Sequence, residues 1–356
     1  MRLSGLCKMT LQRLYANNIV MERDVRLDCY RSLTMMYIVC IMHPILWYSI
    51  DIFGFDPTMF IDMPVIFFIA GASQTFTQRR NIIDTIKNRA QRVLLPYYIF
   101  IVIALLLMTI ATLFDISFEG NYLDIRNIGI IGIAKILLTG GSDSIPYFGY
   151  TWFISTYMII SCSLPIQQRI MDRISYRWYM LILIIVFALW KATKIISPET
   201  IIENILSYNI FYILGYVAYK KIRPGYIIAI ISTIVWIYLI YSGIATPFGE
   251  HKFPSDIIFV IYSLSSLVVI SFVVSRISIK YNHILRIWNE RGYTIYLYQS
   301  VTHFIVYKII GRIQILSDND ILLFIISAIM VFILATALSH ITILPEKYIL
   351  NKISKR

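Results

Sequence analysis

The sequence predicts an all-α, polytopic integral membrane protein with about ten transmembrane helices and both termini in the cytoplasm. Of its 356 residues, 58% are hydrophobic and only 15% are charged, and the mean hydropathy is +0.71. Soluble globular domains carry about 25% charged residues. Since a membrane-spanning helix uses about 20 residues, ten such helices would occupy roughly 200 residues of this chain. The composition excludes a soluble enzyme, a disordered protein and a dinucleotide-binding sheet.

Apolar runs of spanning length recur along the whole chain and divide it into ten segments. They fall at residues 32–52, 57–75, 93–114, 150–167, 178–196, 202–219, 225–243, 256–275, 292–311 and 320–343. A weaker apolar stretch at 128–138 predicts a half-span or an interfacial helix. We find no long-period repeat beside these segments and no room for an appended soluble domain.

The distribution of lysine and arginine orients these segments, because basic loops stay in the cytoplasm during membrane insertion. With the N-terminus inside, the predicted cytoplasmic loops contain 25 of the 32 lysine and arginine residues, and the opposite side contains 7. This asymmetry supports the alternation of ten spans with both termini inside. It also explains the net charge of +12 without a nucleic-acid partner.

The predicted membrane domain covers residues 24–345, between a cytoplasmic segment at 1–23 and a basic cytoplasmic tail at 346–356. The four cysteines lack CxxC spacing, and the chain has no Walker A loop, GxSxG or HExxH motif. We therefore expect no bound metal and no chemistry driven by ATP.

The N-terminal residues contain no continuous apolar run of the kind that a cleaved signal peptide needs. Met21 directly precedes the polar run ERDVRLD. It could be the true start in place of Met1 or Met9, and residues 1–20 would then be dispensable.

Ionisable side chains inside spans are costly and by default indicate function. His43 lies twelve residues after Arg31, about 18 Å along the first helix and past the midplane. A histidine at this depth can act as a general base, because its pKa is close to the working pH. Asp62 enters the second segment at a compatible depth, and its carboxylate could orient the imidazole. The alternatives are a packing histidine and an interfacial aspartate in water.

Arg89 and Arg92 lie where the chain passes from the second segment to the third. Three positions apart, they share one face of a helix, and two guanidinium groups there suit phosphate. Taken alone, these residues favour ordinary anchoring at the cytoplasmic boundary. His303 lies at a depth similar to that of His43, with Gln299 one turn earlier on the same face. For His303, a structural packing role is favoured over a catalytic one.

Seven segments of the chain resemble, in the same order, segments of the membrane acyltransferase type 3 family, whose members mostly acetylate sugars. The matching segments are RLDCYRSLTMMYIVCIMH (26–43), MPVIFFIAGA (63–72), RAQRVLLPYYIF (89–100), TWFI (151–154), FYILGYVAYK (211–220), KFPSDIIFVIYSL (252–264) and TIYLYQS (294–300). Each motif is weak alone, but their order, the ten spans and the orientation together are fairly specific.

This resemblance implies transfer of an acyl group from an acyl-CoA, most often acetyl-CoA, to a hydroxyl of a cell-surface polysaccharide or its lipid-linked precursor. It implies that Arg89 and Arg92, with Arg31, bind the anionic CoA from the cytoplasm. His43, supported by Asp62, would deprotonate the acceptor hydroxyl or stabilise a covalent intermediate. The expected partners are a glycan acceptor and membrane lipids.

Candidate acceptor-binding residues are Tyr150, Trp152, Gln299 and His303. Tyr150 and Trp152, at the outer end of the fourth span, could stack on a sugar or anchor the helix, and anchoring is slightly favoured. Gln299 stands where the family pattern has a histidine, which argues that this position is not the base.

A second departure from the family pattern concerns the spacing of Arg31 and His43. The family often has ten residues between these positions, whereas this chain has eleven. Twelve positions along a regular α-helix put two side chains about 120° apart. A direct partnership of Arg31 and His43 therefore requires a bulged helix. A third departure is Ala70, where the family usually has a serine before glycine.

The location implied is a multi-pass protein of the cell membrane, in bacteria the inner membrane. A transporter or flippase of a lipid-linked glycan is the alternative function, and it would favour internal repeats with broken midspan helices. A glycan polymerase would be expected to have larger loops outside the membrane. Neither feature is visible in this sequence.

Overall fold

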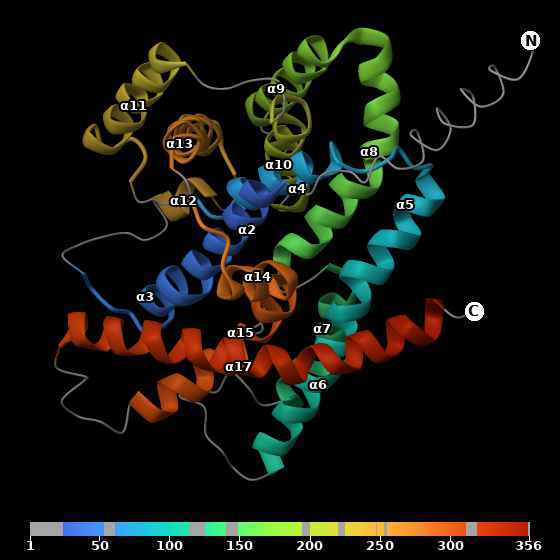
Figure 1. The fold of residues 1–356 in the computed structure, drawn as a ribbon, viewed down its shortest axis with the longest axis vertical. Coiled ribbons are helices and arrows are strands. Elements are labelled where there is room, and N and C mark those ends of the chain that lie inside the picture. The colour runs from blue at the N-terminus through green and yellow to red at the C-terminus, as the bar shows by residue number, and fades with distance from the viewer. Residues whose placement is uncertain are drawn as a thin grey trace, which may run out of the picture.

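A computed structural model describes residues 24–52, 61–113, 125–139, 149–193, 200–219, 225–246, 248–252, 255–277, 279–310 and 319–354. These residues form helices and no strand (Figure 1). The cytoplasmic segment predicted at 1–23 lies outside this set. In Figure 1, the long helix α17 (Asp320–Ser354) crosses one side of the molecule, and α11 (Tyr226–Tyr241) lies on another.

Each of the ten predicted apolar segments coincides with helix. The first runs without a break through α2 (Val25–Tyr37), a π-helix η1 (Ile38–Met42) and α3 (His43–Trp47). The other nine are α4 (Met63–Gln74), α6 (Leu95–Leu113), α8 (Phe153–Ile174), α9 (Tyr176–Ala192), α10 (Thr200–Ala218), α11, α13 (Ile257–Val274), α15 (Gly292–Ile310) and α17.

Shorter elements connect these helices. The predicted half-span is α7 (Ile125–Thr139), which is kinked at Gly129. The remaining elements are α5 (Ile82–Arg89), a second π-helix η3 (Ala90–Leu94), the 3₁₀ turn η4 (Gly149–Trp152), α12 (Phe248–Lys252) and α14 (His283–Glu290).

By length and apolar composition, five helices within the described ranges can cross a membrane. They are Val25–Trp47, Ile82–Leu107, Ile201–Ala218, Ile257–Val274 and Asp320–Lys352. The pair α8 and α9, bent by 118°, would add a sixth as a single broken span, where the sequence predicts two. The chain is thus an all-helical, multi-pass membrane protein, and ten spans with both termini inside stay a prediction.

Hydrogen bonds sort the helix termini into two groups at opposite ends of the bundle. At the first, which we call the Asp24 end, the start of α2 meets the last turns of α4, α10 and α13 and the end of α14. The bonds there join Tyr219 to Asp24 (2.9 Å), Tyr30 to the Val274 carbonyl (3.3 Å), and Arg31 to Ser73 (2.6 Å) and Asn289 (3.0 Å).

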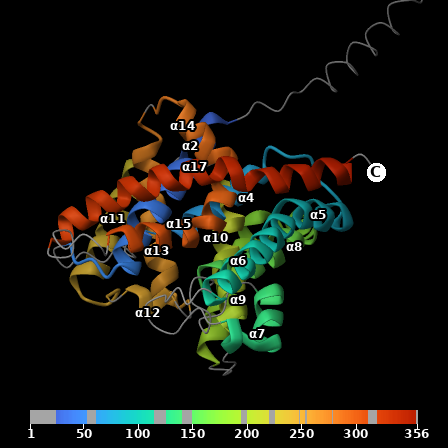
Figure 2. The same cartoon turned by 90° about the horizontal axis from the view of Figure 1, so that it is seen from below.

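At the second, which we call the Asp62 end, the starts of α4 and α10 are bonded to the connection from α12 to α13, and the chain after α3 is bonded to the start of α17. The bonds there join Lys252 to Asp62 (2.7 Å), Ser255 to Asn204 (3.1 Å) and the Asp51 amide to Asp320 (3.1 Å). Alternating spans require such a division of helix starts and ends. Figure 2 shows α14 and α12 on opposite sides of the bundle.

Two glycines let α4 and α10 cross at very short range. A Cβ atom on Gly71 would overlap the Tyr212 carbonyl oxygen, and one on Gly215 would overlap the Phe68 carbonyl oxygen. Small residues at a crossing let helix backbones approach closely, which is how helices associate inside membranes. The glycines of the predicted segments 63–72 and 211–220 therefore hold α4 and α10 together.

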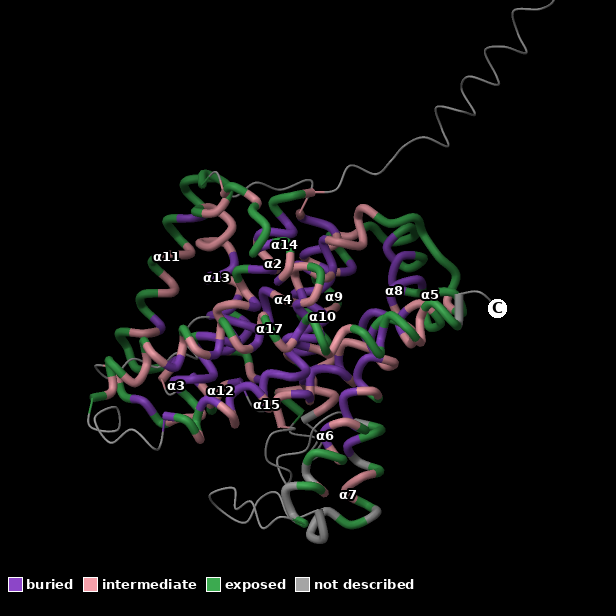
Figure 3. Tube along the Cα trace, turned by 60° about the horizontal axis from the view of Figure 1, so that its bottom comes forward, coloured by how far each residue is buried: buried purple, intermediate pink, exposed green. Residues whose placement is uncertain are grey.

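Buried residues are concentrated around α2, α4, α10 and α15, whereas α11 and α7 are mostly exposed (Figure 3). The apolar segment predicted to end at 343 continues as helix to Ser354, through Pro345. Glu346 is buried there and accepts hydrogen bonds from the Thr294 hydroxyl at 3.0 and 3.2 Å. The predicted boundary at 345 between membrane domain and tail thus falls inside a helix.

Candidate active site

A π-helix determines where His43 points. Its five residues, Ile38–Met42, lie between Arg31 and His43. A π-bulge adds one residue to an α-helical turn. Each residue of an α-helix rotates the chain by about 100°, so the bulge offsets that much rotation for the residues after it. The twelve-residue spacing then places the two side chains about 20° apart instead of 120°. The structure thus contains the bulge that a partnership of Arg31 and His43 requires.

His43 is buried, with 6% of its surface exposed, and its ring is held by Gln299. The Nδ1 atom of His43 lies 2.6 Å from Gln299 Oε1. An amide oxygen only accepts hydrogen bonds, so Nδ1 is the donor, and Nε2 of a neutral ring keeps its lone pair. The Gln299 side chain is fully buried, and its Nε2 has no hydrogen-bond partner among the described residues.

Aromatic side chains enclose the His43 ring. Trp47, one helical turn later, stacks on it with centroids 4.5 Å apart and planes 9° apart. The rings of Tyr150 and Tyr296 each lie 6.4 Å away, and His303 lies at 6.3 Å. An apolar enclosure excludes water and strengthens the electrostatic interactions inside it. The structure therefore brings three predicted acceptor-site residues, Tyr150, Gln299 and His303, to His43.

Both ring nitrogens of His303 form hydrogen bonds that hold the fold together. Its Nε2 donates to the Val39 carbonyl at 3.0 Å, and its Nδ1 accepts from the Tyr48 hydroxyl at 2.9 Å. Val39 lies in the π-helix, where hydrogen bonds along the helix are displaced. His303 thus ties α15 to the bulged turn below His43, which agrees with the structural role favoured from sequence.

Asp62 does not orient His43 in this structure. Its two carboxylate oxygens accept hydrogen bonds from Lys252 Nζ at 2.7 and 2.9 Å, and both side chains are buried. A buried carboxylate needs a paired charge, and Lys252 provides it. The imidazole donates its hydrogen bond to Gln299 and not to Asp62 as expected.

Arg31 lies at the Asp24 end, on the face of the first helix that also carries His43. Its two terminal nitrogens donate to Ser73 at 2.6 Å and to Asn289 at 3.0 Å, and Asp28 lies 3.8 Å away. A third of the side chain remains exposed. Arg31 therefore connects α2, α4 and α14 and keeps part of its side chain accessible.

Arg89 and Arg92, which are predicted to share one face of a helix, differ in burial. Arg89 is buried, and its guanidinium lies 5.8 Å from the centre of the Tyr157 ring, whereas Arg92 is exposed. The cause is the π-helix η3, which starts directly after Arg89. Within the described ranges, Arg89 has no carboxylate partner and its Nε has no hydrogen-bond partner. A buried, uncompensated guanidinium attracts an anion.

Trp152 packs against α10. Its ring lies 5.3 Å from that of Tyr208, and Tyr208 in turn packs on Phe67 of α4. Of the two aromatic residues predicted to stack on a sugar, Tyr150 is the one with a ring contact to His43, at 6.4 Å. Trp152 joins the start of α8 to α4 and α10, which is the anchoring interpretation.

Residues 24–340 match the family model of the acyltransferase domain. This is most of the chain. The chain belongs to the membrane acyltransferase type 3 family. No curated protein and no solved structure matches it.

Several residues of this acyltransferase site gave no recognised signal in the sequence. Lys252 counted only as a single basic residue in an outer loop, and the uncharged Ser73 and Asn289 resemble many other polar residues. Trp47 could have been found, because it follows His43 by four positions and so shares its helical face. Within the described ranges, no group of three metal-ligating side chains occurs.

Proposed function

We propose that this acyltransferase transfers an acetyl group from acetyl-CoA to a hydroxyl of a cell-surface polysaccharide or of its lipid-linked precursor. The observation that carries the proposal is the bond of Gln299 to His43 Nδ1, which leaves Nε2 of a neutral, buried imidazole as a proton acceptor. The resemblance of the motifs supplies the donor and the acceptor class. We place the protein in a cell membrane, in bacteria the inner membrane, with ten spans.

In the proposed reaction, His43 Nε2 accepts the proton of the acceptor hydroxyl while its oxygen attacks the thioester carbonyl. A C–O bond forms, and the carbonyl oxygen becomes an oxyanion. When the C–S bond breaks, the thiolate of CoA leaves and takes the proton from His43. No oxidant, reductant or metal is needed.

Gln299 is suited to orient the base. Its side chain is fully buried, and its Oε1 accepts the hydrogen bond from His43 Nδ1 at 2.6 Å. This contact fixes both the tautomer and the orientation of the imidazole, so we propose that Gln299 is a positioning residue for His43.

The donor would be bound on the side of the bundle where Arg89 lies. Its buried guanidinium has no carboxylate partner among the described residues, so a CoA phosphate would complete its environment. Arg31, on the face that His43 shares, is the second candidate. In the predicted orientation both residues face the cytoplasm, where CoA is available.

The test is acetyl transfer by purified protein in proteoliposomes, with labelled acetyl-CoA and the surface glycan of the source cells. His43→Gln should abolish the transfer while the protein is still inserted and folded. His340→Gln is the matched control, because His340 is exposed on α17. Transfer at the wild-type rate by His43→Gln would show that His43 is not the base.

A deletion strain separates acetylation from glycan transport. NMR of its surface polysaccharide should show the polymer present and its O-acetyl groups lost. Loss of the polymer itself would instead favour the transporter or flippase.

A further inference from the structure

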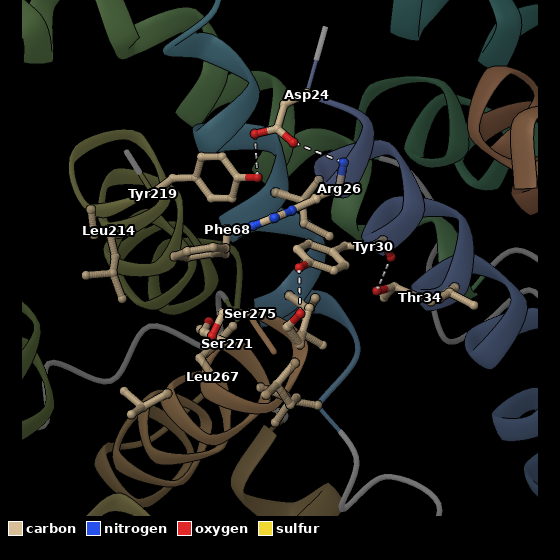
Figure 4. A pocket seen from close by; sticks show the side chains of 18 of the residues that line it. Asp24, Arg26, Tyr30, Thr34, Phe68, Leu214, Tyr219, Leu267, Ser271 and Ser275 are labelled. Carbon is tan, nitrogen blue, oxygen red and sulfur yellow. Dashed lines mark hydrogen bonds between the residues drawn. The ribbon is translucent and has the colours of Figure 1, made fainter. Parts of the chain in front are cut away.

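A cavity of about 610 Å³ lies between α2, α4, α10 and α13, apart from His43 (Figure 4). None of the residues at the candidate active site lines it. Its volume is within the range of sites that bind small molecules. The cavity is a second candidate binding site in this acyltransferase.

The body of the cavity is apolar. Leu33, Val65, Phe68, Leu214 and Leu267 come from four different helices and line it. Asp24 and Arg26 are the only charged side chains among its lining residues, and both lie at the start of α2. The polar side chains deeper in the lining are the uncharged Thr34, Tyr37 and Ser271, and the Thr34 hydroxyl already donates to the Tyr30 carbonyl. Such a lining suits a hydrocarbon chain better than a nucleotide, whose charged groups would lose their hydration.

Arg26 forms the polar mouth of the cavity. Figure 4 shows its guanidinium extending between the rings of Phe68, Tyr30 and Tyr219. Within the described ranges it makes no ion pair and no side-chain hydrogen bond. The nearby Asp24 carboxylate already accepts from the Tyr219 hydroxyl at 2.9 Å and from two backbone amides of α2. The Asp24 carboxylate is thus occupied by hydrogen bonds within the fold, and the Arg26 guanidinium can bind a ligand.

A second guanidinium lies close to this mouth. A smaller cavity of about 180 Å³ shares Arg26, Tyr30 and Ser275 with the first and is also lined by Arg276. The Arg276 guanidinium lies 3.5 Å from the centre of the Phe272 ring. One of its nitrogens, Nη1, donates to the Phe272 carbonyl at 2.8 Å and to the Ser275 hydroxyl at 3.2 Å. The Ser275 hydroxyl donates to the same carbonyl at 2.8 Å, so the groups left for a ligand at this mouth are the two guanidinium groups, which suit phosphate.

The position in the bundle identifies the source of the ligand. The mouth lies at the Asp24 end, among helix termini, which in a membrane protein is the level of the lipid head groups. Basic pockets between transmembrane helices at this level bind anionic lipid head groups. We propose that this cavity binds an anionic bilayer phospholipid, with its phosphate at Arg26 and Arg276 and one acyl chain between α2, α4, α10 and α13.

The experiment uses the full chain in detergent and measures binding of photoactivatable phosphatidylglycerol, with photoactivatable phosphatidylcholine for comparison. We expect saturable labelling by phosphatidylglycerol, mapped to peptides of α2 and α13. Arg26→Gln should weaken binding about fivefold, since one arginine near the head groups contributes about 1 kcal/mol. Leu214→Trp should block the chain and abolish labelling, with the same melting temperature as wild type.

Arg286→Gln is the matched control, because Arg286 is exposed and does not line the cavity. It should bind as the wild type does. Equal labelling by phosphatidylcholine, wild-type binding by Arg26→Gln, or an equal loss in Arg286→Gln would overturn the proposal. If Leu214→Trp fails to fold, Arg26→Gln still decides. The assay contains no acyl donor, so it is independent of the transfer reaction.

Discussion

His43 and Gln299 are joined by a hydrogen bond of 2.6 Å between Nδ1 and Oε1, across 256 positions of sequence. This bond fixes the tautomer of the base. Gln299→Met keeps the side-chain length but removes both polar atoms. We expect kcat to fall about a hundredfold, with little change in KM for the donor, because the orientation of the base is lost.

Gln299→His is the matched variant, since it restores the residue of the family pattern and keeps an acceptor for Nδ1. It should retain more activity than Gln299→Met. Steady-state kinetics in proteoliposomes checks both. Equal activities of Gln299→Met and wild type would exclude the proposed positioning role of Gln299.

The buried pair of Asp62 and Lys252 predicts strong coupling in stability. Asp62→Asn or Lys252→Met alone leaves one buried charge without its partner, which should cost about 3–5 kcal/mol. The double variant should recover most of that loss, because no charge remains. Thermal unfolding in detergent of the wild type, the two single variants and the double variant measures this coupling. If Asp62 is instead part of the catalysis, the double variant should be stable but inactive.

Arg89 and Arg92 should respond differently to substitution. Arg89→Gln removes the buried guanidinium and should raise KM for acetyl-CoA at least tenfold, whereas exposed Arg92→Gln should change it less than threefold. Initial rates at varied acetyl-CoA concentration give the KM of each variant and test this difference. Equal effects of the two changes would mean that the arginines act as one pair, as their spacing alone suggests.

The π-helix predicts that the register of the first helix controls activity. Deletion of Ile41, which lies on the exposed side of η1, should convert the bulge to a regular α-helix and keep Arg31 and His43 on one face. Insertion of an alanine after Ile41 should rotate His43 by about 100° and abolish transfer. Acetyl transfer by both variants, normalised to folded protein, tests this. A more severe loss in the deletion than in the insertion would contradict it.

The crossing of α4 and α10 predicts that both of its glycines are needed for stability. Gly71→Ala and Gly215→Ala should each destabilise the protein by about 1–3 kcal/mol or more, because the added methyl group meets backbone that cannot move aside. Gly225→Ala is the control, since a Cβ there meets nothing within 4 Å. Thermal unfolding of the three variants checks the prediction. Equal stabilities would contradict the close crossing.

The sequence predicts the location of helices well, because apolar run length is a property of each segment alone. All ten segments coincide with helices, and the tally of basic residues agrees with the grouping of helix ends. Pairing between side chains was harder to predict. His43 and Gln299, or Asp62 and Lys252, are brought together by packing of distant helices, and depth along two helices does not specify which groups touch.

Local backbone irregularity explains two other differences. The equal faces expected for Arg89 and Arg92 assume 3.6 residues per turn, and η3 breaks that period directly after Arg89. For Arg31 and His43 the same kind of irregularity, η1, restores the shared face. Neither π-helix has a glycine or proline that would reveal it in the sequence.

Helix α4 has only twelve residues, so its rise is about 18 Å, compared with about 30 Å for the hydrocarbon layer of a bilayer. Ser73, which holds Arg31, lies at one end, and Asp62, which holds Lys252, lies at the other. Along α4, the polar contacts of the two ends are therefore separated by little more than half of the usual permeability barrier. In the proposed reaction, a donor that enters beside α4 would have only that shortened distance to cross.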